Sequence, residues 1–228
     1  VVTDLKDVIS EKEKNWATFG IGPGHGVQMK SGRLIIPAYV YYFDSRTEPT
    51  SHAFTFYSDD EGSTWNVGEH IEDDSGCSTL YCNARSKSGH RVEALSSNSG
   101  EAFDKPSNAQ KLIETCKGCQ GSVLKIHYPD KGTWLLYSHP ANKNERKNLG
   151  IYVNKTPSDL TQWNLNDTIN NGPSGYSDLA ECAKTEYIAC LMECGDKTEN
   201  EEIAFKLVKI NDAVDSAQVD SRLSVGNA

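Results

Sequence analysis

The chain has 228 residues, a net charge of -9 and a mean hydropathy of -0.58, and these values already disfavour several classes of protein. The length is sufficient for the hydrophobic core of one large domain. The acidic charge argues against nucleic acid as a partner, because phosphate binding requires clustered positive charge. No apolar run approaches the roughly 18 residues that a membrane-spanning helix needs, so any contact with a membrane is expected to be peripheral or to use an anchor that the sequence does not show.

Short β-strand patterns follow one another along the chain. The opening residues 4–15 permit a helical turn or two, and so does the segment 104–115. Runs of apolar, β-branched and aromatic residues, each bounded by Gly, Pro, Asn, Asp or Ser, occupy residues 33–42, 53–58, 122–128, 133–138 and 149–153. Strands of this length and spacing favour a sandwich, barrel or propeller. No low-complexity linker interrupts the pattern, so we predict one domain over residues 1–228.

An eight-residue turn motif recurs along the chain. The first copy has the sequence S-D-D-E-G-S-T-W, and the second has the related sequence S-S-N-S-G-E-A-F. The copies occupy residues 58–65 and 96–103, and we expect residues 161–163 to end a third. In the first copy, Asp60 is expected to accept hydrogen bonds from turn amides, Gly62 to supply a positive φ and Trp65 to pack beneath the turn. Such a motif, an Asp box, at repeated spacing indicates propeller blades.

Seven cysteines at irregular spacing predict free thiols and not a disulfide framework. Cys116 and Cys119 form a single C-x-x-C pair, but no second pair or histidine pair accompanies it, so we predict no metal site. No cofactor is expected either. The chain opens at Val1 with neither an initiator methionine nor a signal peptide, so we expect a fragment of a longer protein.

Several segments resemble the animal exo-α-sialidases, and they follow in the order of that family. The first is W-A-T-F-G-I-G-P-G-H-G at residues 16–26. The others are I-P-A-Y at 36–39, N-A-R at 83–85, G-C-Q-G-S at 118–122, W-L-L-Y-S-H-P at 134–140 and G-Y-S-D-L at 175–179. The tract 192–205 looks most like the vertebrate membrane-associated ganglioside sialidases. The resemblance implies an all-β, six-bladed β-propeller, of which this chain supplies about four blades.

The resemblance also implies roles for three residues in removing terminal sialic acid from glycoconjugates. Arg85 and Arg146 match the second and third of three arginines that hold the sugar carboxylate, a task for which bidentate guanidinium groups are suited. Tyr176 matches the nucleophile of a retaining glycoside hydrolase. A neutral phenol is not repelled by the substrate carboxylate, as a carboxylate nucleophile would be, but it requires a base.

Further residues match the sugar pocket of the family. Tyr39 and Tyr41 are similar to tyrosines that contact the glycerol and N-acyl groups, although strand tyrosines also pack between blades. Gln120 matches a pocket residue near the substrate. We expect His139 to have a structural role and Arg91 to lie at the surface.

The chain departs from the family at three points. No Arg-Ile-Pro tripeptide is present, so the first arginine of the clamp and the acid/base aspartate that follows it have no match. The stretch between the Asp box and Arg85 is about one strand too short for the glutamate that activates the tyrosine. Glu72 is the nearest candidate in that stretch, and a turn residue is its alternative role.

Three functions therefore remain open from the sequence. The first is a retaining exo-α-sialidase that acts on sialylated glycolipids and glycoproteins. The second is an inactive propeller that binds sialic acid, and the third is a non-enzymatic Asp-box propeller for protein interaction. The ordered motifs disfavour the third. For the first two, we expect a location at the plasma or endosomal membrane, by peripheral association, or in the cytoplasm.

Overall fold

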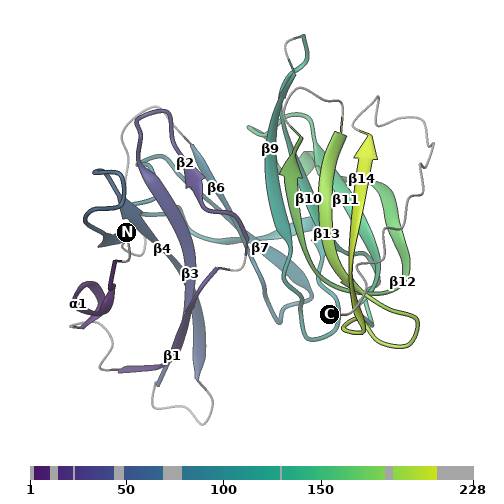
Figure 1. The fold of residues 1–228 in the computed structure, drawn as a ribbon, viewed down its shortest axis with the longest axis horizontal. Coiled ribbons are helices and arrows are strands. Elements are labelled where there is room, and N and C mark those ends of the chain that lie inside the picture. Colours follow the sequence, from purple (N-terminus) through teal and green to yellow (C-terminus); the bar gives the residue numbers. More distant parts are fainter. Residues whose placement is uncertain are drawn as a thin grey trace, which may run out of the picture. The chain divides into compact units, whose positions relative to one another are not determined.

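The computed structural model describes residues 3–10, 15–22, 24–43, 49–68, 79–128, 130–182 and 187–209. The regular structure is almost entirely β (Figure 1). The chain forms two compact units. One comprises Val1–Ala84 and Glu93–Ser107, and the other comprises Arg85–Val92 and Asn108–Ala228. None of the helices in the described part of the chain is long and apolar enough to cross a membrane.

The first unit is built on one antiparallel sheet. Its elements are α1 (Lys6–Ile9), β1 (Trp16–Ile21), β2 (Val27–Gln28), β3 (Leu34–Tyr42), β4 (Thr50–Ser58) and β5 (Asn66–Val67). The strand order is β1-β3-β4-β5, and β2 also pairs with β3. The hairpin of β3 and β4 runs in continuous register from Leu34 opposite Ser58 to Tyr42 opposite Thr50. The core contains Val40 and Phe56 from these strands and Ile9 from α1.

The second unit contains a six-stranded sheet. Its strands are β9 (Ser122–Tyr128), β10 (Gly132–Pro140), β11 (Lys147–Asn154), β12 (Asn164–Glu181), β13 (Tyr187–Cys194) and β14 (Glu202–Lys209), which are labelled in Figure 1. They pair in the order β14-β13-β12-β11-β10-β9. The long strand β12 pairs with β11 up to Pro173 and with β13 from Ser174 onward. Strands β9 to β12 thus form an antiparallel group of four, the number found in a propeller blade. The second half of β12 begins the next group, with β13 and β14.

A third sheet has the order β6-β7-β8, with β6 at Leu80–Ala84, β7 at His90–Ser96 and β8 at Ser107–Ile113. Its residues are divided between the two units. The helical turn expected within residues 104–115 is wrong, because β8 occupies that segment. Ala109 and Leu112 are buried at a helix-like spacing of three, but pairing with β7 supplies the backbone hydrogen bonds. The turn expected within residues 4–15 is confirmed by α1, and the five strand predictions agree with β3, β4, β9, β10 and β11.

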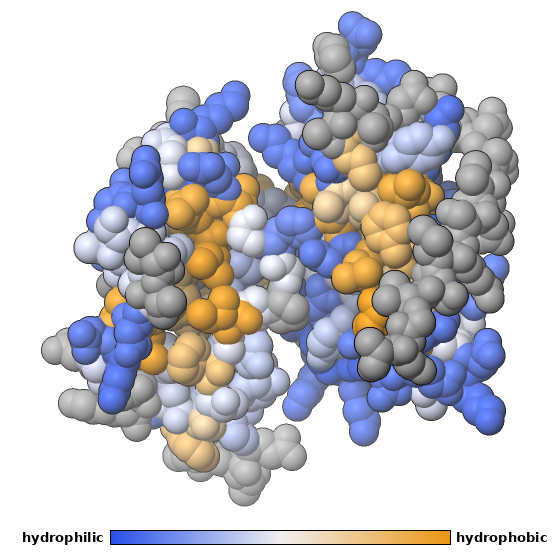
Figure 2. Space-filling model, viewed as in Figure 1, coloured by the Kyte–Doolittle hydropathy of each residue, from blue (hydrophilic) through white to orange (hydrophobic). Residues whose placement is uncertain are grey.

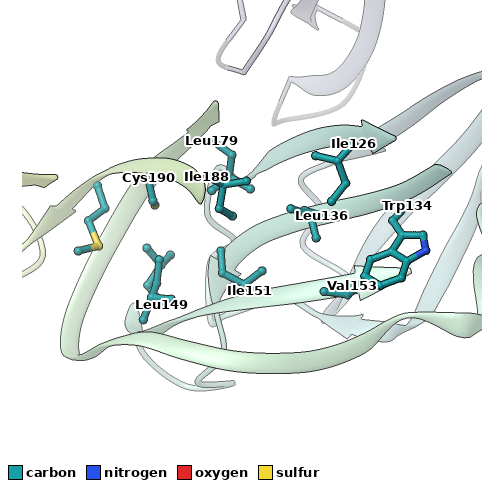
Figure 3. Close-up of a cluster of buried hydrophobic side chains, with 11 residues drawn as sticks. Ile126, Trp134, Leu136, Leu149, Ile151, Val153, Leu179, Ile188 and Cys190 are labelled. Carbon is teal, nitrogen blue, oxygen red and sulfur yellow. The ribbon is translucent and has the colours of Figure 1, made fainter. Parts of the chain in front are cut away.

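Alternating side chains of the six-stranded sheet form the core of the second unit (Figure 3). On β11 the buried members are Leu149, Ile151 and Val153, which lie two residues apart. This spacing brings them to one face of the strand. The remaining buried members are Ile126, Trp134, Leu136, Ile169, Leu179, Ile188, Cys190 and Met192. Burial of each large side chain of this kind contributes about 1.5–3 kcal/mol.

Apolar side chains also reach the surface of both units (Figure 2). On the last two strands, exposed Leu191 of β13 lies opposite exposed Phe205 of β14. Ile203 and Leu207 are exposed two residues to either side of Phe205. The period of two brings all three β14 side chains to one face of the strand, and an apolar stripe of this kind typically marks a surface against which another layer packs.

The predicted Asp box has the expected geometry. Asp60 Oδ1 accepts hydrogen bonds from the Thr64 amide and the Ser58 hydroxyl, each at 2.8 Å. Gly62 has a φ of 86°, and Trp65 Nε1 donates to the Gly62 carbonyl. The amide and hydroxyl of Thr64, followed by the hydroxyl of Ser58, lower the pKa of Asp60 to about 2. The carboxylate therefore organises the turn.

The second copy of the motif repeats this geometry without a carboxylate. Asn98 Oδ1 accepts from the Ala102 amide and the Ser96 hydroxyl, and Gly100 has a φ of 85°. The residues expected to end a third copy behave differently. There Asp159 caps the short 3-10 helix η2 (Leu160–Gln162), and the chain then buries Trp163. The third segment thus also ends in an aromatic residue, which is more deeply buried than Trp65 or Phe103, but it lacks the turn.

Two glycines with the same backbone geometry give a matched test of the second turn. Gly100 and Gly89 have φ values of 85° and 86°, so an alanine at either position costs about 1–2 kcal/mol of backbone strain. A Cβ at Gly100 would also lie 3.1 Å from Leu80 and 3.2 Å from Ile35, whereas a Cβ at Gly89 meets no atom within 4 Å. We expect Gly100→Ala to lower the free energy of unfolding by about 1–3 kcal/mol more than Gly89→Ala, owing to overpacking. Urea denaturation of the two variants measures this difference. Equal losses of unfolding free energy would contradict the close packing of this turn against Leu80 and Ile35.

Candidate active site

Tyr176 occupies an irregular point of β12. The register with β13 shifts between Ser174 and Ser177, and Tyr176 lies within that shift. Its amide donates to Glu193 Oε2 at 2.9 Å, so a side chain of the neighbouring strand β13, in place of a backbone carbonyl, accepts from this backbone group. The side chain is 37% exposed. β-Bulges commonly re-aim a side chain beside an active site, and this one presents the phenol at the surface of the second unit.

Arg85 and Arg146 both lie beside this phenol. Arg85 Nη1 donates to Tyr176 Oη at 3.5 Å, and Arg85 Nη2 donates to the Lys117 carbonyl at 2.9 Å. The guanidinium of Arg146, from the loop between β10 and β11, lies 5.5 Å from the centroid of the Tyr176 ring. Arg146 Nη2 donates to the Gly118 carbonyl at 3.2 Å. Three residues that are distant in the sequence are therefore brought together within one unit.

Arg85 and Arg146 bring two positive charges to Tyr176, and the carboxylates of Glu193 and Glu199 lie next to them. Arg146 forms a long ion pair of 3.5 Å with Glu199, whose side chain is one-third exposed, and a pair of this kind is weak in water. Each guanidinium has five N–H donors, and the backbone carbonyls use one on each arginine. Donors thus remain for an anionic ligand, and a planar carboxylate is the group that guanidinium forks bind best.

Gln120 lies at the end of the turn that precedes β9 and is 7% exposed. Its Oε1 accepts from the Ser177 amide at 2.9 Å, and its Nε2 donates to the Ser177 and Gly121 carbonyls, each at 3.0 Å. The amide thus holds the backbone directly after Tyr176. Contact with a sugar, as the sequence predicts for Gln120, stays a prediction.

The other predicted pocket residues belong to other parts of the chain. Tyr39 and Tyr41 belong to β3 of the first unit, with ring centroids 6.0 Å apart in an edge-to-face arrangement. Tyr39 is 39% exposed, and their roles as sugar contacts also stay predictions. Glu72, the candidate for the activating glutamate, lies outside the described residues.

A buried charged cluster behind the arginines was not predicted from the sequence. Arg91 is 2% exposed, so the expectation of a surface arginine is wrong. Its Nη1 donates to Glu114 Oε1 at 2.6 Å and to the Cys119 carbonyl at 2.7 Å. His139 Nε2 lies 3.1 Å from Glu114 Oε2, which agrees with a structural role for this histidine. One sequence feature could have indicated this cluster. Strand β7 has Arg91 and Glu93 two residues apart, so both side chains point to the same face of the strand, and the structure buries both.

The cluster holds its groups in defined charge states. Burial alone would raise the pKa of Glu114, but the hydrogen bond from His139 and the charge of Arg91 outweigh it and lower the pKa to about 2. Burial also lowers the pKa of His139 from 6.5, which favours the neutral imidazole. Glu114 is therefore a carboxylate that accepts a hydrogen bond from neutral His139 and pairs with the Arg91 cation.

Comparison with known proteins places these residues in a family. The BNR repeat-like domain matches residues 6–188. Sialidase-3 of Rattus norvegicus is 40% identical, over 90% of this chain and 62% of that protein. Sialidase-4 of Mus musculus is 32% identical, over 94% of this chain and 67% of that protein. The alignment with the rat protein, at 262 residues, is longer than the chain itself, so that relative has internal residues without a counterpart here.

Solved structures show the fold. The leech intramolecular trans-sialidase in complex with 2,7-anhydro-Neu5Ac superposes with a TM-score of 0.69 at 24% identity, over 89% of this chain and 33% of that chain. The intramolecular trans-sialidase of Ruminococcus gnavus has a TM-score of 0.67 at 24% identity, over 92% of this chain and 48% of that chain. The chain is thus part of a β-propeller of the kind expected from the sequence, and it spans about 62% of the length of the rat relative.

Stability is expected to fall on acidification in two stages. Because the pKa of His139 is below 6.5 in the folded state, the unfolded chain takes up that proton first, and stability decreases as the pH falls below about 6.5. The pKa of Glu114 is lowered from 4.5 to about 2, so further stability is lost between those values. One pKa unit corresponds to about 1.4 kcal/mol, so the second stage amounts to roughly 3 kcal/mol.

Urea denaturation at about pH 7, 5.5 and 3.5 measures both stages. The variant Glu114→Gln lacks the titrating carboxyl, so its unfolding free energy should change less than that of the wild type between the two lower pH values. A wild-type stability that stays constant or rises on acidification would contradict the charge states assigned to the cluster.

Proposed function

The chain belongs to the sialidase family, and on that premise we propose that it carries the nucleophile and two carboxylate-binding arginines of a retaining exo-α-sialidase. The proposed reaction is the hydrolytic removal of terminal α-linked sialic acid. The proposed substrates are gangliosides and glycoproteins, whose sialic acid carries a carboxylate on the anomeric carbon. Peripheral association with a membrane, or a cytoplasmic location, is proposed with these substrates.

One observation carries the proposal. The phenol of Tyr176 accepts a hydrogen bond from Arg85, and its ring lies beside the guanidinium of Arg146. A carboxylate bound by both arginines would place the carbon that bears it close to the phenol oxygen. This juxtaposition supports attack by Tyr176 on the anomeric carbon, because in sialic acid that carbon bears the carboxylate.

The two guanidinium groups beside the ring also suit the chemistry of a phenol nucleophile. Attack requires the phenol to lose its proton, and cationic groups fixed near the oxygen stabilise the developing negative charge. A general base must still take the proton. None of the hydrogen bonds that the described residues make to Tyr176 Oη comes from a carboxylate, and the sequence candidate Glu72 lies outside those residues.

Binding of sialic acid without hydrolysis is the second candidate function. The chain contains no Arg-Ile-Pro tripeptide, so neither the first arginine of the clamp nor the acid/base aspartate has a match in this sequence. Absence of general acid/base help lowers the rate by about 10²–10⁴-fold. Two arginines and the phenol would still hold the carboxylate of the sugar.

Replacement of the nucleophile tests the proposal. Tyr176→Phe removes only the phenol oxygen, so we expect it to abolish release of 4-methylumbelliferone from its α-sialoside. The control is Tyr128→Phe, which keeps the ring packed 4.6 Å from Trp134 and should retain the wild-type rate. Release that survives in Tyr176→Phe would contradict the assignment of the nucleophile.

Calorimetric titration with free N-acetylneuraminic acid separates the two candidate functions. Hydrolysis that depends on Tyr176 supports the enzyme, whereas binding without release of the fluorophore supports the second function. Arg85→Ala should weaken binding in both cases, because removal of one partner of a charge-assisted hydrogen bond costs about 1.5–3 kcal/mol. Neither binding nor release in the wild type would contradict both functions.

A further inference from the structure

The turn at residues 116–120, between β8 and β9, connects the two arginines of the site. Arg85 donates to the Lys117 carbonyl, and Arg146 donates to the Gly118 carbonyl. These carbonyls belong to consecutive residues, so the distance between the two guanidinium groups depends on the shape of this turn. A Cβ at Gly118 would lie 2.8 Å from Arg85 Nε, which shows how closely the turn approaches that side chain.

Glu114 holds this turn from behind. Its Oε2 accepts from the Cys119 amide at 3.1 Å, at the far end of the turn. Its Oε1 accepts from the Ser86 amide at 3.1 Å, in the residue directly after Arg85. One carboxylate therefore ties the backbone beside the first arginine to the turn that binds both arginines.

Two further groups complete the attachment. Arg91 Nη1 bridges Glu114 Oε1 and the Cys119 carbonyl, and His139 lies against Glu114 Oε2. Each carboxylate oxygen thus has two partners, and these four partners match the roughly four acceptor sites that a carboxylate offers. Glu114 is 2% exposed, so it acts on a ligand only through the residues that it holds.

We propose, on the basis of the function proposed above, that Glu114 is the positioning residue that sets the spacing of Arg85 and Arg146. It thereby determines how tightly the site binds the carboxylate of a sialic acid. Glutamine is a poor substitute at this position. Its amide nitrogen is a donor, and it would face an N–H group from which the carboxylate accepts a hydrogen bond. Aspartate keeps the charge but is one methylene shorter, so it cannot reach the Ser86 and Cys119 amides together.

The first test requires no ligand. Guanidinium NMR measures rotation about the Cζ–Nε bond of Arg85 and Arg146, which their hydrogen bonds to the turn should slow. We expect Glu114→Gln to speed this rotation several-fold in both arginines. The matched control is Glu93→Gln, since Glu93 is also buried and accepts from the Tyr81 hydroxyl at 2.6 Å, and it should leave both rotations unchanged.

The second test is a mutant cycle on binding. The probe is 2-deoxy-2,3-didehydro-N-acetylneuraminic acid, and its methyl ester is the version without the charged carboxylate. Misplacement of a group by about 1 Å costs on the order of 100-fold in catalytic rate. We expect a loss of that size or smaller in binding, so Glu114→Gln should weaken binding of the acid by about 10- to 100-fold. Binding of the ester should be nearly unchanged. In the Arg85→Ala, Arg146→Ala background the effect of Glu114→Gln on the acid should disappear.

The outcomes separate the two proposals. Failure of the wild type to bind the acid contradicts the proposed function, while the NMR comparison still decides the role of Glu114. Equal weakening of the acid and the ester, or an effect that persists without the two arginines, would show a merely structural role. Unhindered rotation of both arginines in the wild type would overturn the inference directly. If Glu114→Gln does not give a native near-ultraviolet spectrum, Glu114→Asp replaces it with the same expected changes.

Discussion

A carboxylate buried in a protein must find donors for its oxygens, and Glu114 finds them in four different parts of the second unit. The backbone amides of Ser86 and Cys119, the guanidinium of Arg91 and the imidazole of His139 all converge on it. An ion pair removed from water recovers its desolvation cost only when its hydrogen bonds are complete. The segments that supply the donors are therefore fixed relative to one another. Arg85 directly precedes Ser86, and both Arg85 and Arg146 donate to the turn that contains Cys119.

The second constraint lies on the long strand β12. It changes partner from β11 to β13 between Pro173 and Ser174, and the register shift that accompanies this change releases the amide of Tyr176 from the ladder. Glu193 and Gln120 then hold the backbone at Tyr176 and Ser177. A phenol with this support has a defined position although the residue is partly exposed, and the role of nucleophile proposed for it requires such a position. The same strand also joins two groups of antiparallel strands, so the site lies where one group gives way to the next.

The sequence allowed part of this arrangement to be predicted. The five apolar runs correspond to strands because alternation and turn residues act locally, and the Asp box has its expected geometry because its hydrogen bonds join residues at most four apart. Arg85, Arg146 and Tyr176 were selected by family resemblance, and the structure brings them together. The prediction for residues 104–115 was wrong because pairing with β7 decided the conformation of that segment. Arg91 was wrongly expected to lie at the surface, because its partner Glu114 is 23 residues away in the sequence.

The sequence by itself determined the β class, the turn chemistry of the Asp box and, through its motifs, the residues expected at the site. These properties depend on side-chain periodicity and on hydrogen bonds between near neighbours in the chain. Only the tertiary structure decided that a buried carboxylate holds the arginine-binding turn. It also decided that Gln120 hydrogen-bonds to the backbone after Tyr176 and that the register of β12 shifts at Tyr176. The physical reason is that each of these contacts joins residues on separate strands and turns, and no local pattern specifies which donor will meet which acceptor when a sheet folds.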